Sequence, residues 1–240
     1  MPLLSVIIPA YNERKTIAHV IERVEQATLP VGFQREIIVI NDGSTDGTRE
    51  ALTPFESRYR IVHQKNTGKG GAVRAGFHIA RGDYIIVQDA DLEQDPNDFS
   101  NLLQPLLENK ADVVFGSRFM GKYIPRKLIM NIHYLMNRFY TIVCNILSGY
   151  HTTDMWTGYK MYTRRALDAF LPYLTSDGVA FEPEIQILLA KLGFRIVDVP
   201  ISYNPRWYAE GKKMNLRQAL KPLIAMFGFA LRRIPRKNAI

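Results

Sequence analysis

Cysteine is almost absent from this 240-residue chain, which contains Cys144 alone. One cysteine cannot form an internal disulfide, and it cannot build a zinc site of the cysteine type. The five histidines do not show the spacing of metal-ligand motifs, and no Ser-His-Asp or Cys-His arrangement stands out. Disulfide scaffolds, zinc modules and enzymes with an activated serine or cysteine nucleophile are therefore not indicated.

Long apolar runs are missing as well. A membrane-spanning helix needs about 18–20 apolar residues, whereas residues 128–147 are interrupted by polar side chains and residues 222–231 are too few. The first residues have the pattern of a short strand rather than the basic and apolar regions of a secretory signal. We therefore expect a cytoplasmic protein that is peripheral on the cytoplasmic face of a membrane and does not cross it.

Positive charge is present in excess, with 31 basic and 23 acidic residues and a formal net charge of +8. Residues 1–114 carry a net charge of −4, whereas residues 115–240 carry +12. Such asymmetry indicates binding to a nucleic acid, an anionic membrane or a phosphorylated ligand, or simply a solvated basic surface. Nucleic acid is disfavoured, because the basic half shows neither a helix-turn-helix motif nor a basic patch interleaved with aromatic residues.

Apolar runs that end in turn residues alternate with segments of helical spacing. The predicted strands are residues 3–9, 36–40, 60–63, 84–87 and 112–115, followed by 159–162 and 196–203. Because these runs are mostly continuous rather than alternating, the pattern predicts an α/β fold with a mostly parallel sheet flanked by helices. Residues 214–240 form a basic tail, and the pattern there predicts an amphipathic helix at a membrane interface.

Polar clusters follow three of the predicted strands, at residues 10–13, 41–44 and 89–91. Ligands of parallel sheets bind beyond the carboxyl ends of the strands, so these clusters predict one pocket. Asp89 and Asp91 form a D-x-D triplet whose carboxylates suit Mg²⁺ or Mn²⁺ completed by phosphate oxygens. The alternative is an acidic turn with helix caps.

Three further residues suit a nucleoside or a phosphate. Asp42 ends a strand and can accept hydrogen bonds from a base or a ribose, or cap the next helix. Lys69 lies in a glycine-rich loop before a helix, where backbone N–H groups and an ammonium favour phosphate. Arg118 ends another strand and can bind phosphate bidentately, or form a surface salt bridge.

Together these segments resemble the inverting family-2 glycosyltransferases of the GT-A fold. The matching motifs are S-V-I-I-P-A-Y-N-E (5–13), I-I-V-I-N-D-G-S-T-D-G-T (37–48), N-T-G-K-G-G-A-V-R-A-G (66–76) and D-A-D-L-E (89–93). The branch that the chain resembles most is the dolichyl- or polyprenyl-phosphate sugar synthases, through G-S-R-F (116–119), D-M-W-T-G-Y-K (154–160), F-E-P-E-I (181–185), V-P-I-S-Y (199–203) and R-x-x-x-E-G-K-K (206–213). The likeness covers nearly the whole chain in order, but it does not fix the sugar.

The resemblance implies a catalytic domain at 1–213, with a nucleotide-sugar half at 1–114 and an acceptor half at 115–213. The nucleoside would be held by Pro9, Ala10, Tyr11, Glu13, Asp42 and Lys69. The metal and the donor diphosphate would be held by Asp89, Ala90 and Asp91, together with Glu93, where the family often has glutamine. The acceptor phosphate would be bound by Arg118, Arg126 and Asn131, and the diphosphate by Arg206 and Lys212 or Lys213 from a closing loop.

The implied reaction moves a hexose, with inversion, from a donor of the GDP-mannose or UDP-glucose type to dolichyl or polyprenyl phosphate, as a dolichyl-phosphate mannosyltransferase does. A lipid phosphate is already an anionic nucleophile, so no strong base is required. A hydroxyl acceptor, as in polysaccharide or glycolipid synthesis, would need a base, for which Asp154 is the candidate; Asp154 could equally anchor its loop. A non-catalytic membrane subunit of the same fold is a further alternative, and a separate membrane protein could position the domain.

Overall fold

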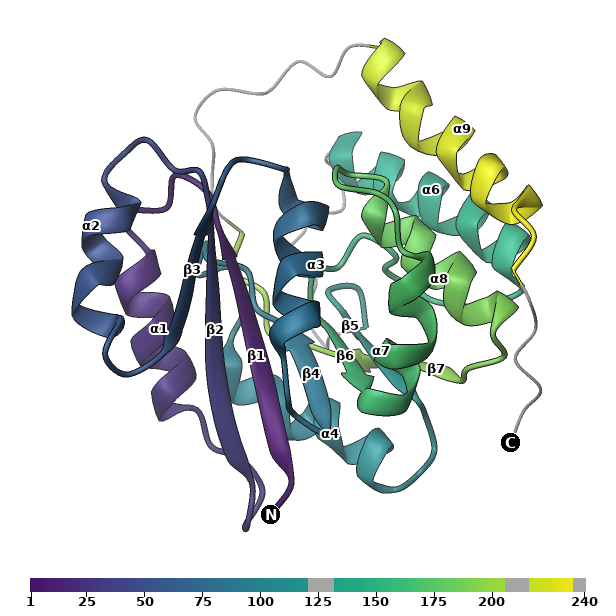
Figure 1. The fold of residues 1–240 in the computed structure, drawn as a ribbon. Coiled ribbons are helices and arrows are strands. Elements are labelled where there is room, and N and C mark those ends of the chain that lie inside the picture. Colours follow the sequence, from purple (N-terminus) through teal and green to yellow (C-terminus); the bar gives the residue numbers. More distant parts are fainter. Residues whose placement is uncertain (121–131, 206–215, 235–240) are drawn as a thin grey trace.

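A computed structural model describes residues 1–120, 132–205 and 216–234 of the chain (Figure 1). Within these residues, seven strands form one sheet in the order β3-β2-β1-β4-β6-β5-β7. The strands are β1 (Leu3–Ala10), β2 (Gln34–Asp42), β3 (Arg60–Gln64), β4 (Tyr84–Val87), β5 (Val113–Ser117), β6 (Lys160–Thr163) and β7 (Ile196–Pro200). The mostly parallel α/β sheet predicted from the apolar runs is confirmed.

Strand β6 is the exception to the parallel arrangement, because it runs antiparallel to both β4 and β5. The other neighbouring strands are parallel to one another, so their carboxyl ends meet at one edge of the sheet. The chain enters β6 from that same edge, where Lys160 lies opposite Phe115. Residues 154–159 are thereby brought to the edge at which the polar clusters of the first half also lie.

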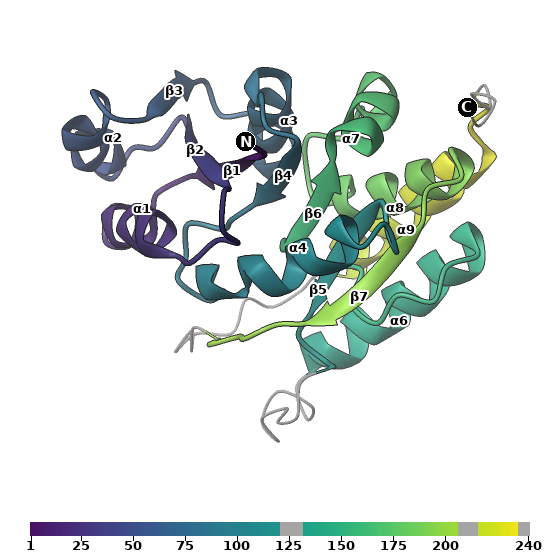
Figure 2. The same cartoon turned by 90° about the horizontal axis from the view of Figure 1, so that it is seen from below.

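Helices cover both faces of the sheet (Figures 1 and 2). On one face, α1 (Ile17–Gln26) and α4 (Phe99–Leu107) share a buried apolar cluster with alternate residues of β1 and β2. On the other face, α3 (Lys69–Ile79), α7 (Arg164–Phe170) and α8 (Phe181–Lys191) share a second cluster. The short α2 (Thr48–Leu52) lies beside α1 at the outer end of the sheet.

A third apolar cluster lies outside these two layers, between α8 and the helices α6 (Ile132–Ser148) and α9 (Leu216–Leu231). Its buried members include Cys144 and Tyr140 of α6, Ile187 of α8 and Met226 of α9. Burial raises the pKa of the Cys144 thiol to about 12, so this cysteine is an inert core residue. Helix α9 is therefore packed against α6 and α8.

Among residues 1–120, 132–205 and 216–234, which the structure describes, no helix is both long enough and apolar enough to cross a membrane.

Candidate functional site

A cavity of about 460 Å³ opens at the carboxyl edge of the sheet, beyond β1, β2 and β4. Its lining consists of Pro9, Ala10, Tyr11, Glu13, Asp42, Asn66, Gly68, Lys69, Ala72, Asp89, Ala90 and Asp91. The structure thus places on one cavity all the residues that the sequence predicted for the nucleoside and for the D-x-D triplet. Asn66, Gly68 and Ala72 were not named as individual site residues from the sequence, although they lie within the glycine-rich motif at residues 66–76.

Asp42 uses its carboxylate to shape the loop that closes one side of the cavity. It is 2% exposed, and it accepts hydrogen bonds from the backbone N–H of Thr67 at 2.9 Å and of Gly68 at 2.8 Å. The side chain of Gln64 donates to the same carboxylate at 2.7 Å. Asp42 therefore holds residues 64–68 rather than the start of α2, so the interpretation as a helix cap is wrong.

The N-terminus of α3 is also partly occupied by the protein itself. The backbone N–H groups of Gly70 and Gly71 donate to the carbonyl oxygen of Asp177, at 2.8 and 3.2 Å. Gly68 has a φ of +85°, and a Cβ there would lie 2.7 Å from that same oxygen. In this structure these two N–H groups of the glycine-rich loop are therefore already used by the carbonyl of Asp177.

Lys69 points at the D-x-D triplet instead. Its ammonium lies 2.7 Å from Oδ1 of Asp89. Burial alone would lower the pKa of Lys69, but the attraction of Asp89, and of other nearby carboxylates, outweighs that effect and raises it. The glycine at position 158 packs directly against this pair: a Cβ there would collide with Oδ2 of Asp89 and lie 2.9 Å from Nζ of Lys69.

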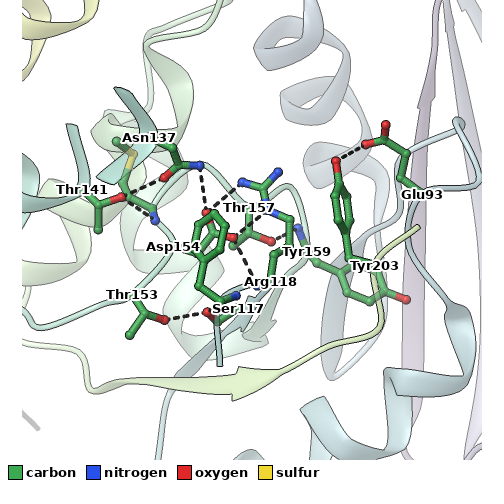
Figure 3. Close-up of polar contacts among 12 residues, drawn as sticks. Glu93, Ser117, Arg118, Asn137, Thr141, Thr153, Asp154, Thr157, Tyr159 and Tyr203 are labelled. Atoms are coloured by element: carbon green, nitrogen blue, oxygen red, sulfur yellow. Dashed lines mark hydrogen bonds and ion pairs between the residues drawn. The ribbon is translucent and has the colours of Figure 1, made fainter. Parts of the chain in front are cut away.

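Glu93 contacts Asp91 through its backbone N–H, which donates to Oδ1 of Asp91 at 3.2 Å. Its carboxylate accepts a hydrogen bond of 2.7 Å from the hydroxyl of Tyr203, as Figure 3 shows. Among the described residues, no group of three or more His, Cys, Asp or Glu side chains is arranged to hold a metal ion. The three-carboxylate metal set expected from the sequence is therefore not assembled in this structure, although Asp89 and Asp91 both line the cavity.

Arg118 and Asp154 form a bidentate ion pair (Figure 3). Nε and Nη2 of Arg118 donate to the two carboxylate oxygens at 2.7 and 2.8 Å, and Asp154 is fully buried. Asn137 of α6 donates a further hydrogen bond to Asp154 at 3.2 Å. Burial opposes the charge on Arg118, but Asp154 more than compensates and raises the pKa of the guanidinium. The surface salt bridge considered for Arg118 is in fact largely buried.

Tyr203 connects Arg118 to the loop of the D-x-D triplet. The Arg118 guanidinium lies 5.2 Å from the centre of the Tyr203 ring, while the Tyr203 hydroxyl binds Glu93. Tyr203 also forms an antiparallel bridge with Gln94, and the backbone N–H of Asn204 donates to the carbonyl of Glu93 at 2.8 Å. Sequence reasoning did not assign Tyr203 a role; its only signal was its place in the V-P-I-S-Y motif.

A buried lysine supports the loop that carries Asp154. Lys160 is 1% exposed, and its ammonium donates to the carbonyls of Met155 and Thr157 and to the carboxylate of Glu182. Burial lowers the pKa of Lys160, and the attraction of Glu182 only partly offsets this. The Lys160–Glu182 pair was also missed in the sequence, where both residues appeared only within longer motifs.

Five residues expected at the site lie outside the part of the chain that the structure describes: Arg126, Asn131, Arg206, Lys212 and Lys213.

Comparison with known proteins agrees with this geometry. The profile of the family described as "Glycosyl transferase family 2" matches residues 5–171. The dolichyl-phosphate beta-glucosyltransferase of Saccharomyces cerevisiae is 32% identical over 237 residues, which cover 89% of this chain and 69% of that protein. The glycosyltransferase AglJ of Haloferax volcanii is 34% identical over 214 residues, covering 88% and 65% of the two chains.

Among solved structures, the chain is similar to glucosyl-3-phosphoglycerate synthase from Mycobacterium tuberculosis in complex with Mn²⁺, uridine diphosphate and phosphoglyceric acid. The TM-score is 0.70 at 20% identity, and the match covers 98% of this chain and 80% of that one. This likeness shows a shared fold, and it confirms the GT-A architecture expected from the sequence. With a family match over most of the sheet and the cavity at its edge, the chain belongs to glycosyl transferase family 2.

Proposed function

We propose that this chain transfers a hexose from a nucleoside-diphosphate sugar to dolichyl or polyprenyl phosphate, with inversion at the anomeric carbon. The observation that carries the proposal is that the buried Arg118–Asp154 pair is linked, through the contacts of Tyr203 with Arg118 and Glu93, to the loop that follows Asp89 and Asp91 at the cavity. The cavity is suited to a donor diphosphate, and Arg118 presents a cation to an acceptor phosphate. Glucose is favoured over mannose, because the similar curated proteins are named as glucosyltransferases.

The donor site fits a divalent metal. Asp89 and Asp91 offer the hard carboxylate oxygens that Mg²⁺ and Mn²⁺ prefer, and Asp89 already faces one cation, the Lys69 ammonium. A metal held by these two residues would neutralise the charge that develops on the leaving diphosphate. Before the donor binds, the positive charge of Lys69 balances the negative charge of Asp89. Arg206, Lys212 and Lys213 are predicted to bind the donor diphosphate as well.

Arg118 is the group that we propose binds the acceptor phosphate, with Arg126 and Asn131 as predicted partners. Its guanidinium is fixed by the two hydrogen bonds to Asp154, which orient it without loss of charge. The acceptor oxygen attacks as an anion, so the residues around it only have to position it and stabilise its charge. Asp154 then acts through Arg118 as a positioning residue.

A hydroxyl acceptor is less consistent with the geometry. Such an acceptor needs a general base within hydrogen-bond reach of its proton. Asp154, the candidate for that base, is fully buried, and both of its carboxylate oxygens accept hydrogen bonds from Arg118. Of the two roles considered for Asp154, the structure favours the anchor.

One assay tests the proposal. The purified chain is incubated with UDP-glucose, GDP-mannose and related donors, with Mg²⁺ or Mn²⁺, and with dolichyl phosphate or its matched control dolichol, which lacks the phosphate. We expect a hexosyl-phosphoryl lipid, identified by mass, from UDP-glucose and dolichyl phosphate. The isosteric variant Asp91→Asn should reduce the rate about 100-fold or more, because one metal carboxylate is neutralised. Equal transfer to dolichol, or no transfer from any donor, would refute the proposal.

A further inference from the structure

Lys69 lies in the first turn of α3, between two anchors that hold the backbone. On one side, Asp42 accepts hydrogen bonds from the backbone N–H groups of the two preceding residues. On the other side, the carbonyl oxygen of Asp177 accepts those of the two following residues, Gly70 and Gly71. Both anchors come from distant parts of the chain, so the direction of the Lys69 side chain depends on where they hold this turn.

The second anchor fits tightly against α3. A Cβ at Gly70 would lie 2.6 Å from the carbonyl oxygen of Ser176 and 2.9 Å from the carbonyl carbon of Asp177. One turn further along α3, Arg74 forms an ion pair of 2.5 Å with the Asp177 carboxylate. In this structure the glycine-rich motif is therefore a packing surface for residues 175–178, which we call the 175–178 loop.

Glu184 of α8 holds the 175–178 loop in this position. Its side chain is fully buried. Its carboxylate accepts hydrogen bonds from the backbone N–H of Thr175 at 3.1 Å, from the Thr175 hydroxyl at 2.7 Å and from the backbone N–H of Ser176 at 2.7 Å. Hydrogen bonds to a charged acceptor are stronger than neutral ones. One buried side chain thus fixes the two residues that precede Asp177.

A cation that balances Glu184 comes from the segment just beyond α9. Nη1 of Arg232 lies 3.3 Å from Oε1 of Glu184 and donates to the carbonyl of Tyr173 at 2.8 Å. Lys191 of α8 donates to the carbonyls of Ala230 and Arg232 at 2.7 and 2.9 Å, which fixes the end of α9 against α8. Helix α8 shares one apolar cluster with α3 and another with α9 (Figures 1 and 2). Polar contacts therefore lead from the end of α9, through α8, to the first turn of α3.

We propose that Glu184 is a positioning residue for the donor site. Through the 175–178 loop it sets the first turn of α3, and it thereby directs the Lys69 ammonium toward Asp89. Arg232 holds Glu184 in turn, so the packing of α9 is coupled to the cavity that Lys69 lines. The catalytic meaning of this coupling rests on the proposed function, because a displaced Lys69 no longer presents its charge where the donor diphosphate would bind.

Amide hydrogen exchange tests the positioning without any ligand. In Arg232→Gln the buried Glu184 carboxylate loses its cation, so we expect the N–H groups of residues 70–71 to exchange about tenfold faster. Arg232→Lys should restore most of the protection, because a single nitrogen of Arg232 contacts Glu184. Arg195→Gln is the matched control, since Arg195 pairs with the buried Asp112 before β5, at the opposite edge of the sheet, and it should leave this exchange unchanged.

Calorimetric titration with UDP and Mn²⁺ measures the consequence at the cavity. Glu184→Gln places an amide nitrogen against a loop that donates hydrogen bonds. We expect this variant and Arg232→Gln to weaken binding about three- to tenfold. Both should have little further effect in a Lys69→Gln background, because they act through the same ammonium. A residue that only stabilises the fold would weaken binding equally in the two backgrounds. Asp112→Asn is the control for the neutralised carboxylate.

Two results would overturn the positioning role. The first is unchanged exchange at residues 70–71 in Arg232→Gln, or an equal change in Arg195→Gln. The second is an undiminished loss of UDP binding in the Lys69→Gln background. Arg232 is 35% exposed, so its variant decides the matter even if Glu184→Gln does not fold.

The positioning role and the proposed function fail separately. A chain that shows the expected exchange but neither binds UDP nor transfers a sugar refutes the proposed function, and it leaves the positioning of residues 69–71 standing. A chain that transfers a hexose to dolichyl phosphate, with exchange that does not respond to Arg232→Gln, refutes the positioning alone.

Discussion

Arg118 holds Asp154 in a bidentate ion pair, with Nε and Nη2 at 2.7 and 2.8 Å from a carboxylate that is fully buried. The two residues are 36 positions apart in the chain and come from the end of β5 and from the loop that leads into β6. The pair therefore ties the end of β5 to the loop whose Gly158 packs against Asp89.

Breaking this pair is expected to cost stability and acceptor binding together. Asp154→Ala leaves a largely buried guanidinium without its partner and should lower the free energy of unfolding by about 3 kcal/mol, measured in urea. The double variant Arg118→Met, Asp154→Ala should lose less unfolding free energy than the sum of the two single variants.

If Asp154 positions Arg118, Asp154→Asn raises KM for the lipid phosphate and leaves the shape of the pH–rate profile unchanged. Loss of the acidic limb of that profile would instead identify Asp154 as a base.

Gly158→Ala tests the close packing against the Lys69–Asp89 pair. The added Cβ would collide with Oδ2 of Asp89, so we expect a loss of about 1–3 kcal/mol in the free energy of unfolding and weaker binding of a nucleoside diphosphate, measured by calorimetry. Gly178→Ala is the control, because a Cβ at Gly178 would meet no atom of the described residues within 4 Å. Similar losses in both variants would show that the effect is not specific to this contact.

Tyr203→Phe separates the two contacts of Tyr203. The variant keeps the ring that faces Arg118 but loses the hydrogen bond to Glu93, at a cost of about 1 kcal/mol in stability. We expect KM for the donor to rise about three- to tenfold, since that range corresponds to one hydrogen bond, while KM for the acceptor stays nearly constant. Tyr203→Ala should raise both values. Glu93→Gln preserves an oxygen that accepts from Tyr203, and it should therefore affect the donor less than Tyr203→Phe does.

Asp198 is expected to make stability depend on pH. Among the described residues, its buried Oδ1 has no hydrogen-bond partner. Burial raises the pKa of Asp198 above the ordinary aspartate value, against the hydrogen bonds that Oδ2 accepts from Thr153. The folded state then binds the proton more tightly than the unfolded state. The contribution of Asp198 to the free energy of unfolding should therefore fall as the pH rises from the ordinary aspartate pKa through the raised pKa of the folded state.

Asp198→Asn cannot titrate and provides the comparison. The difference in unfolding free energy between this variant and the wild type should grow with pH across that window and favour the variant at neutral pH. Chemical denaturation at a series of pH values measures it. Asp168→Asn, on the exposed side of α7, is the control. A constant difference between Asp198→Asn and the wild type would contradict the expectation.

The order of strands and helices was determined by the sequence alone. Continuous apolar runs such as the one that became β1 can only be buried on both faces, which requires helices on both sides of a parallel sheet. The position of the cavity followed from the same reasoning, because carboxyl ends of parallel strands share an edge. The motifs at those ends were enough to find Asp42, Lys69, Asp89 and Asp91.

Which group each side chain contacts was decided by the tertiary structure. Asp42 accepts hydrogen bonds from the 64–68 loop, Glu93 accepts one from Tyr203, and Asp154 forms an ion pair with Arg118. These partners are distant in the chain, and no spacing rule relates them. Strand β6 runs antiparallel to its neighbours, which brings residues 154–159 to the edge of the sheet where the site lies. A short apolar run in the sequence does not show whether its strand will pair in a parallel or an antiparallel direction. Likewise, a sequence shows that a helix is apolar on two sides, but only packing decides which side remains exposed.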